Sequence, residues 1–207
     1  MVEKLYAYGL RGNVHDFIKS YLYNRSQYTC ANDINSDLES VIAGVPQGSI
    51  LSPLLFNLFI NDIVSLKVDN VTLYADDAVF CLTDDNFYGC IARVNEFIYH
   101  LTKWLNMIQL IPNTDKTVVM LFSNSTENNL PNIFFRGNEL QWVDEIKYLG
   151  LYLDRKLLFS THINKVCSKI SSGQGVIYSL SSYLPIKVLL SLYYTLVYPH
   201  VNMNIII

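Results

Sequence analysis

Charged residues are scarce in this chain of 207 residues, and its cysteines are not paired in sequence. Lys, Arg, Asp and Glu make up 16% of the chain and apolar residues 51%, so we expect a folded core and not a disordered chain. No C-x-x-C motif joins any of the four cysteines, and the four histidines do not cluster beside them. The sequence therefore indicates neither a disulfide framework nor a zinc site. It favours a reducing, intracellular setting, either cytoplasmic or nuclear.

The sequence also lacks an apolar leader and an uninterrupted membrane span. Glu3 and Lys4 closely follow Met1, so a secretory signal is not expected. The most apolar long stretch, residues 176–198, contains Pro185 and Lys187, which would place a break and a charge near the middle of a bilayer. Two buried or half-buried helices explain this stretch better, and no membrane partner is expected.

Basic charge is not in excess, because a formal net charge of −3 excludes a histone-like basic coat. The charge is nevertheless uneven: residues 146–207 carry a net +5, which leaves −8 on residues 1–145. Six acidic residues and one lysine lie between residues 62 and 85. An acidic focus followed by a basic segment suits a metal site beside a phosphate-binding surface. A chance split over solvated faces explains the charges equally well.

Apolar periodicity and turn residues predict a mixture of helices and short strands. The first thirty residues read as helical pieces broken at Gly9 and Gly12. Ser52 and Pro53 read as the N-cap and first residue of a helix that is apolar almost all round, so we expect that helix to be buried. The strongest helical pattern begins after Asn86 and continues to about residue 110. Further strands are predicted at residues 118–122, 133–135 and 146–153, and further helices from residue 161 and after residue 185.

Two adjacent carboxylates, Asp76 and Asp77, separate two β-prone runs at residues 71–75 and 78–82. This spacing predicts a β-hairpin with the two aspartates at its tip. Because the flanking strands are apolar, we expect the carboxylates to lie close together and partly desolvated, where a cation would offset their repulsion. Oxygen ligands of this kind suit Mg²⁺. An ordinary hairpin tip is the alternative, since aspartate is a good turn residue.

The segment Gly-Val-Pro-Gln-Gly-Ser at residues 44–49 is a turn-rich loop that leads into the predicted helix. Gly44 and Gly48 would allow a ligand to approach the backbone closely, and the positive end of the helix would favour phosphate. The Gln47 amide can donate and accept hydrogen bonds, so it could contact a base edge or a sugar. An ordinary strand-to-helix loop is the alternative.

Taken together, these two features resemble a known family. The sequence Gly-Val-Pro-Gln-Gly-Ser-Ile-Leu-Ser-Pro-Leu-Leu-Phe at residues 44–56, followed by Tyr-Ala-Asp-Asp at residues 74–77, is similar to the motifs of reverse transcriptases. Later segments resemble the non-LTR retrotransposon (LINE or jockey-like) branch: Asn-Thr-Asp-Lys-Thr at 113–117, Lys-Tyr-Leu-Gly at 147–150, residues 153–163 and residues 193–200. The resemblance covers essentially the whole chain. It implies an α+β fold, a partial polymerase palm (an antiparallel sheet backed by helices) with part of a helical thumb.

The resemblance implies roles for individual residues. Asp76 and Asp77 would be the catalytic metal ligands of a two-metal site, in which one Mg²⁺ activates the primer 3′-hydroxyl and the other stabilises the leaving pyrophosphate. Lys116 would protonate or neutralise the pyrophosphate, although a surface lysine beside a strand is the simpler interpretation. The other implied sites are the substrate-binding residues Pro46, Gln47, Gly48 and Tyr74, the primer-grip residues Tyr148, Leu149 and Gly150, and the nucleic-acid-binding residues Arg155, Lys156, Lys165 and Lys169.

The sequence also departs from the family pattern. A segment of the type D-x-x-x-A-F-D supplies a further metal-ligand aspartate in the family, and these 207 residues do not contain one. Asp16, Asp33 and Asp37 do not follow a β-prone run, and Thr114 stands where family members commonly have proline. We therefore expect a chain that lacks the fingers and is truncated at both ends. Residues 1–145 would be the C-terminal part of the palm, and residues 146–207 a primer-grip hairpin with a partial thumb.

The function implied is template-directed polymerisation of deoxynucleotides, with an RNA or DNA template, a DNA primer and deoxynucleoside triphosphates as partners and Mg²⁺ as cofactor. Because the third carboxylate is missing, the two-metal site is incomplete, and we expect this chain alone to be inactive or nearly so. Two alternatives stay open. One is a non-enzymatic retroelement relic that at most binds nucleic acid through its basic C-terminal region, and the other is a membrane-associated protein built on residues 176–198. Apolar faces left exposed without fingers also predict self-association.

Overall fold

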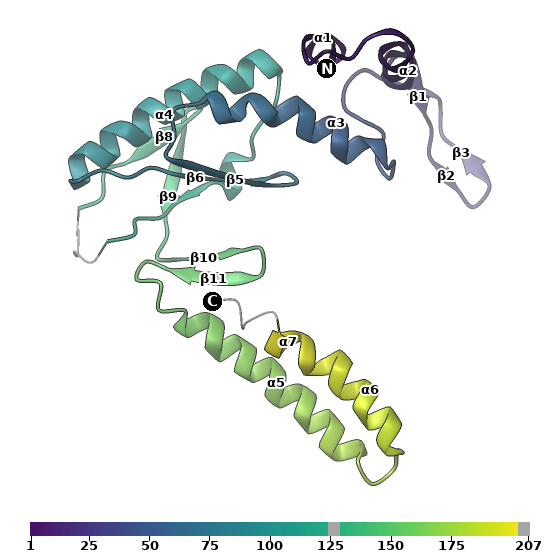
Figure 1. Cartoon of the computed structure of the whole chain (residues 1–207), viewed down its shortest axis with the longest axis vertical. Coiled ribbons are helices and arrows are strands. Elements are labelled where there is room, and N and C mark those ends of the chain that lie inside the picture. The colour runs from purple at the N-terminus through teal and green to yellow at the C-terminus, as the bar shows by residue number, and fades with distance from the viewer. Residues whose placement is uncertain (124–128, 203–207) are drawn as a thin grey trace. The chain divides into compact units, whose positions relative to one another are not determined.

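The chain folds as a mixture of α-helices and short β-strands (Figure 1). The computed structural model describes residues 1–123 and 129–202. The chain divides into two compact units, Met1–Ile111 and Pro112–Ile207. Across the described residues, the strands form four two-stranded antiparallel sheets and one three-stranded sheet. The α+β fold class predicted from the sequence is therefore confirmed.

The first unit begins with two helices, α1 (Val2–Ala7) and α2 (Gly12–Leu22), separated where the sequence predicts a break. Gly9 lies between them with a φ of +95°, a conformation that glycine adopts without steric cost. The predicted helical pieces end at α2, however, and the prediction is wrong for residues 25–30. That segment enters an antiparallel ribbon in which β1 (Arg25–Gln27) pairs with β4 (Glu39–Val41) and β2 (Cys30–Ala31) pairs with β3 (Ile34–Asn35).

The ribbon closes at a two-residue turn, Asn32 and Asp33, both with positive φ. Asn and Asp tolerate this conformation better than other non-glycine residues, and two such residues favour a tight hairpin over a helix. The local turn chemistry therefore decides the structure of this segment.

The helix after the 44–49 loop is α3 (Leu51–Ile60), which is followed by the 3₁₀ turn η1 (Asn61–Ser65). Ser52 is not its N-cap as predicted, because the helix begins at Leu51 and the Ser52 hydroxyl donates a hydrogen bond to the carbonyl oxygen of Pro46. Pro53 is the third helical residue, still in the first turn, where its missing N–H is not needed.

The expectation that α3 is buried is correct for one stripe of the helix. Ser52, Leu55 and Ile60 are its buried residues, whereas Leu54 is 55% exposed. An apolar helix is buried only where another element packs against it, and sequence periodicity does not reveal how many faces are covered. At its C-terminal end, Lys4 of α1 donates to the Phe59 carbonyl and pairs with Asp62 at 2.7 Å.

The predicted hairpin is present as β5 (Asn70–Tyr74) and β6 (Asp77–Cys81), and the long helix as α4 (Phe87–Ile108). The Asn86 side chain accepts a hydrogen bond from the Gly89 N–H at 2.8 Å, which confirms Asn86 as the N-cap. Phe80 of β6 packs on Phe97 of α4 with ring centroids 4.7 Å apart. One face of the hairpin is therefore covered by α4.

The open end of this hairpin is tied to α4 by a small polar network. The Arg93 guanidinium donates to the Asp69 carboxylate at 2.7 Å and to the Thr83 carbonyl. Asp69 also accepts from the backbone N–H and the hydroxyl of Thr83, at 2.5 and 2.8 Å. These contacts, the Arg93 hydrogen bond first, lower the pKa of Asp69 to about 2.

The second unit contains a three-stranded sheet in the order β7 (Val118–Val119), β9 (Asn138–Trp142), β8 (Ile133–Phe135). The strand predicted at residues 118–122 is thus real but shorter than expected, and it pairs with β9 in parallel. This sheet is therefore mixed, where a wholly antiparallel sheet was expected. The predicted strand at residues 133–135 is confirmed as β8.

The region predicted as strand at residues 146–153 is an antiparallel hairpin of β10 (Glu145–Tyr148) and β11 (Leu151–Asp154). Three helices follow: α5 (Ser160–Leu180), α6 (Ile186–Leu196) and α7 (Tyr198–Asn202). The predicted helix starts at residue 161 and after Pro185 are confirmed to within one residue. Residues 176–198 thus form the end of one helix, a turn and a second helix, and no helix in residues 1–123 or 129–202 is long and apolar enough to cross a membrane.

Candidate functional site

The two adjacent carboxylates lie at the bend between β5 and β6, where the turn begins one residue earlier than predicted. Tyr74 pairs with Asp77, so the two-residue turn consists of Ala75 and Asp76, and Asp77 is the first residue of β6. Ala75 has a φ of +52°, a left-handed conformation that costs a non-glycine residue roughly 1–2 kcal/mol. The bend therefore stores backbone strain beside the carboxylates, as functional turns often do.

The register also decides which way the carboxylate of Asp77 faces. Leu73 and Ala78 are paired and share the Phe80 face of the hairpin, which α4 covers. Asp77 and Tyr74 form the neighbouring pair, so they lie on the opposite, uncovered face, and Tyr74 is 62% exposed. Tyr74 and Asp77 are thus brought together on one exposed face of the hairpin, and Asp76 lies next to Asp77 in the exposed turn.

The expectation that Asp76 and Asp77 are partly desolvated is wrong, because both residues are exposed. The apolar strands bury their side chains against α4, but the tip of the hairpin extends past that contact. Two exposed carboxylates can still share a cation, because water screens their repulsion and leaves their oxygens accessible.

The remaining acids of residues 62–85 are not gathered at this bend. Asp62 pairs with Lys4, Asp69 pairs with Arg93, and Asp84 accepts hydrogen bonds from Asn86 at 3.2 Å. Among the described residues, no group of three or more His, Cys, Asp and Glu side chains could hold a metal ion. Asp76 and Asp77 offer two accessible carboxylates, the kind of oxygen ligand that Mg²⁺ prefers, and this ion commonly completes its coordination with water. They do not by themselves provide for two ions.

The 44–49 loop is held from α2. The Tyr21 hydroxyl donates to the Ser49 hydroxyl and lies 3.5 Å from that of Ser52, and these hydrogen bonds, that of Ser49 first, lower the pKa of Tyr21. Arg25 donates to the Gly44 carbonyl at 2.6 Å. Gln47 and Gly48 are exposed between these anchors, and a Cβ built on Gly48 would meet nothing within 4 Å. Of the predicted substrate residues in this loop, Gln47 and Gly48 are therefore accessible to a ligand, and Pro46 is half-buried.

Lys116 and the predicted primer grip belong to the second unit. Lys116 is exposed in the 3₁₀ turn η2 (Thr114–Lys116), whose backbone is capped by Asn113 at 3.2 Å. At the tip of the β10–β11 hairpin, Leu149 and Gly150 both have positive φ, the signature of a type I′ turn, and both are exposed. The Tyr148 hydroxyl is instead buried, with no hydrogen-bond partner among the described residues.

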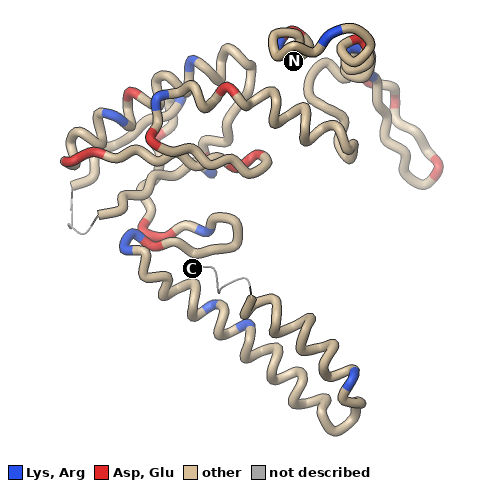
Figure 2. The backbone as a smooth tube through the Cα atoms, in the orientation of Figure 1, with Lys and Arg blue, Asp and Glu red and all other residues tan. Residues whose placement is uncertain are grey.

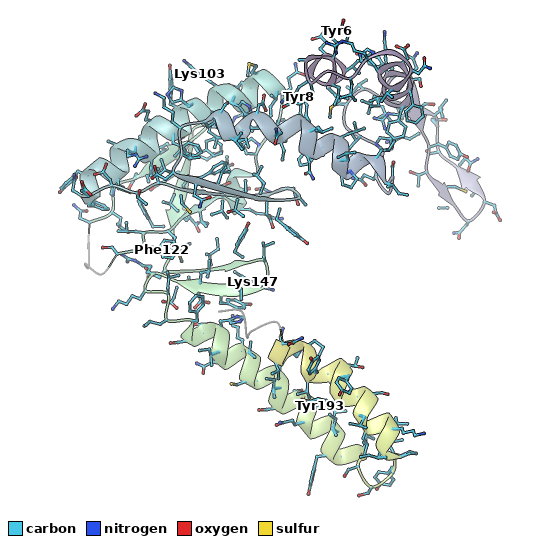
Figure 3. The ribbon with its side chains drawn as sticks, in the orientation of Figure 1. Tyr6, Tyr8, Lys103, Phe122, Lys147 and Tyr193 are labelled. Atoms are coloured by element: carbon cyan, nitrogen blue, oxygen red, sulfur yellow. The ribbon has the colours of Figure 1, made fainter. Side chains whose placement is uncertain are left out.

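The predicted nucleic-acid-binding residues differ in what they already contact. Arg155 donates to Asp144 at 3.1 Å and to the Leu121 carbonyl at 3.2 Å, so its guanidinium helps to hold the unit together. Lys165 lies over the ring of Tyr152 at 3.5 Å, and Lys147, labelled in Figure 3, lies 5.8 Å from the same ring.

Lys156 and Lys169 are exposed. Figure 2 shows basic residues and no acidic ones along the described helices after β11, in agreement with the sequence. The charged side chains of the described α5–α7 helices are therefore all basic, and they are exposed.

The sequence did not indicate the structural roles of three residues near these sites. Tyr21 acts on partners 28 and 31 residues away, and Arg93 on a partner 24 residues away. The Asp154 carboxylate accepts hydrogen bonds from the backbone N–H groups of Lys156, Leu158 and Phe159, in the segment between β11 and α5. These hydrogen bonds, that of Leu158 first, lower the pKa of Asp154. Periodicity and motif spacing cannot reveal such long-range or irregular contacts.

Comparison with known proteins identifies the family of the chain. The model of the reverse transcriptase (RNA-dependent DNA polymerase) family matches residues 2–153, which include the 44–49 loop, the carboxylate hairpin, Lys116 and the β10–β11 turn. The chain belongs to the reverse transcriptase family. The resemblance inferred from the sequence motifs is thus confirmed.

Relatives of this reverse transcriptase chain are polymerases of mobile elements. It is 29% identical over 157 residues to the RNA-directed DNA polymerase from mobile element jockey of Drosophila melanogaster, covering 72% of this chain and 17% of that protein. It is 27% identical over 173 residues to the "probable RNA-directed DNA polymerase from transposon X-element" of the same species, covering 80% and 19%. The chain therefore spans less than a fifth of the length of these relatives. No solved structure matches it.

Proposed function

We propose that this chain contributes to template-directed polymerisation of deoxynucleotides on an RNA or DNA template, by two-metal phosphoryl transfer in which the 3′-hydroxyl of a DNA primer attacks the α-phosphate of the incoming deoxynucleoside triphosphate and pyrophosphate leaves. The observation that carries the proposal is the exposed bend where Asp76 and Asp77 lie beside Tyr74, within the family match. Mg²⁺ would supply charge neutralisation at the reacting phosphates. Asp76 and Asp77 would hold that ion through carboxylate oxygens, and Tyr74 would contact the substrate next to it.

The other proposed roles follow from accessibility. Pro46, Gln47 and Gly48 would shape the pocket for the incoming deoxynucleotide and its templating base, and the exposed Gln47 amide supports this role. Lys116 would neutralise or protonate the departing pyrophosphate, for which an exposed ammonium is suited. In the primer grip, Leu149 and Gly150 are the accessible residues, whereas Tyr148 would act through its ring and backbone.

The proposed division of labour places palm functions in residues 1–145 and primer-grip and thumb functions in residues 146–207, of which residues 203–207 lie outside the described part. Lys156, Lys165 and Lys169 would meet nucleic-acid phosphates, with Arg155 contributing less because it is paired with Asp144. RNA templates and deoxynucleotides are intracellular molecules, so the activity belongs in the cytoplasm or the nucleus.

We further propose that the chain alone does not polymerise at a measurable rate, because two carboxylates provide part of a two-metal site. The test is Mg²⁺-dependent extension of a DNA primer on an RNA template by the purified chain, with Asp76→Asn as the control. We expect no extension above that of the control. Robust synthesis by the wild-type chain would contradict the proposed inactivity.

The metal-binding half of the proposal is tested separately, by titrating the chain with Mn²⁺ in place of Mg²⁺ and following the free ion by electron paramagnetic resonance. Asp76→Asn and Asp77→Asn should each weaken binding about tenfold or more, because one of two charged ligands is lost. Asp85→Asn is the matched control, since Asp84 and Asp85 are a second adjacent pair of exposed aspartates. Equal Mn²⁺ binding by all four proteins would overturn the assignment of the hairpin.

A non-enzymatic relic that binds nucleic acid is the second candidate, and the observation that favours it is the absence of acidic residues from residue 155 onwards. It predicts binding of a primer–template that weakens steeply with salt, without metal binding at the hairpin. If the wild-type chain binds neither Mn²⁺ nor a deoxynucleotide but binds nucleic acid in a salt-dependent way, the result favours the relic over the polymerase.

A further inference from the structure

A chain of hydroxyl groups joins α2 to both ends of the Gln47–Gly48 segment. Tyr21 donates to the Ser49 hydroxyl, whose oxygen also accepts the Leu51 N–H at 3.2 Å. The Tyr21 hydroxyl also lies 3.5 Å from that of Ser52, which donates to the carbonyl oxygen of Pro46. A single phenol therefore contacts the hydroxyls that hold the residues before and after Gln47 and Gly48.

The loop needs such an anchor because little else restrains it. Gly44 and Gly48 have positive φ and open space around them, and glycine loses more conformational freedom on ordering than any other residue. Gln47 is exposed, and Ile42 and Ile50, on either side of the loop, are 97% and 95% exposed, so apolar packing contributes little at these positions. Hydrogen bonds, from Tyr21 of α2 and from Arg25, then supply much of the restraint.

The anchor itself is well placed to be rigid. Tyr21 is half-buried in the last turn of α2, and its ring stacks on Phe17 one helical turn earlier, with centroids 6.3 Å apart. Ser52 is 6% exposed, so the hydroxyl network ends in a protected position at the start of α3. A second, independent hydrogen bond from Arg25 to Gly44 holds the beginning of the loop.

We propose that Tyr21 is a positioning residue that fixes the 44–49 loop and, through it, aims the Gln47 amide at the incoming deoxynucleotide. The first part stands on the contacts above, and the second rests on the proposed function of the loop. Tyr21 does not touch the substrate in this scheme; it acts through the hydroxyls of Ser49 and Ser52.

The first experiment measures amide hydrogen exchange of residues 47–51 in the full chain by mass spectrometry. Tyr21→Phe keeps the ring and its stacking but removes the hydroxyl, and it should speed exchange in this segment about fivefold, the factor that corresponds to one net hydrogen bond. The matched control is Tyr23→Phe, because Tyr23 is 56% exposed two residues further on. Exchange unchanged in Tyr21→Phe, or raised equally throughout the chain, would overturn the inference.

A double variant shows whether Tyr21 acts through Ser49. If it does, Tyr21→Phe combined with Ser49→Ala should speed exchange by less than the product of the two single effects, because both changes break the Tyr21–Ser49 hydrogen bond and only the contacts with Ser52 and the Leu51 N–H are lost separately. Effects that multiply would mean that the two residues restrain the loop independently, which contradicts the proposed path.

The second experiment measures binding of a deoxynucleoside triphosphate with Mn²⁺ by calorimetry. Tyr21→Phe should weaken binding severalfold, as should Gln47→Ala, whereas Tyr23→Phe should not. If Tyr21→Phe loosens the loop and leaves nucleotide affinity unchanged, the positioning role is wrong. If the wild-type chain binds no nucleotide at all, the proposed function of the loop fails, and the exchange data still decide whether Tyr21 anchors it.

Discussion

Single residues in this chain fall into those already engaged by the fold and those left accessible to a ligand. Asp62, Asp69 and Arg155 bind partners within their own unit, and their charges are thereby committed to structure. Asp76 and Asp77 are exposed at a bend. Carboxylates of the same chemistry therefore differ in whether a ligand can reach them. Only those without a partner in the fold are candidates for catalysis.

The buried hydroxyl of Tyr148 leads to a prediction about stability. Tyr148→Phe removes a polar group that has no partner among the described residues, so the free energy of unfolding should rise by about 1 kcal/mol. Urea denaturation followed by circular dichroism measures this, with Tyr178→Phe as a control because Tyr178 is 83% exposed. A loss of stability on removing the Tyr148 hydroxyl would show that it has a partner after all.

The lowered pKa of Asp69 predicts a dependence of stability on pH. Its pKa falls from 3.8 to about 2 on folding, chiefly through the hydrogen bond from Arg93, so its contribution is fully present above the unfolded value and is lost as pH falls through the folded one. The difference in melting temperature between wild type and Asp69→Asn should therefore be constant above about pH 5 and shrink between pH 4 and 2. A difference that persists unchanged to pH 2 would contradict this account.

At the scale of secondary-structure elements, the packing of α5 on the helices that follow it depends on a glycine, Gly173, which has no side chain. A Cβ at Gly173 would lie 3.0 Å from both the Leu196 carbonyl oxygen and a methyl group of Val197, whereas one at Gly175 would meet nothing within 4 Å. Replacing these two glycines by alanine should therefore change the free energy of unfolding in opposite directions.

Gly175→Ala should stabilise the chain by about 0.5–1 kcal/mol, because alanine has the higher helix propensity and no clash opposes it. Gly173→Ala should destabilise it by roughly 1 kcal/mol, since the strain of overpacking exceeds that gain. Thermal unfolding of both variants measures the two signs in one background. If both substitutions shift the melting temperature in the same direction, close packing at Gly173 is not what holds these helices together.

At the scale of the whole molecule, the described surface carries many large apolar side chains. Ile42, Ile50 and Ile111 are each at least 89% exposed, and Leu54 is 55% exposed. Apolar patches of this kind promote association with other surfaces. We expect the chain to self-associate with rising concentration, and the association to persist in high salt because it is apolar.

Sedimentation velocity over a range of concentrations tests this expectation. Leu54→Ser should reduce the associated fraction, and Gln174→Ser, an exposed polar position on α5, should not. A chain that remains monomeric at the highest concentration would refute the prediction, and association that disappears in high salt would point to charge instead.

Features that depend on local pattern could be predicted from the amino-acid sequence alone. The Asn86 cap and the long α4 helix, the hairpin around the adjacent aspartates, and the helix after Pro185 all follow from period, cap and turn residues within a few positions of one another. Family membership likewise followed from two motifs in order, and the family match confirms it. The one-residue shift of the turn to Ala75 and Asp76 lies beyond such reasoning, because register depends on the pairing of whole strands.

Which of these residues are exposed, buried or already bound follows from the packing of the elements in three dimensions. It left α3 half-covered, exposed the carboxylates that apolar strands were expected to shield, and engaged Arg155 with Asp144. It also supplied Tyr21, whose partners are 28 and 31 residues away along the chain. Burial and long-range hydrogen bonds depend on which elements pack against one another, and the order of residues along the chain carries little information about that packing.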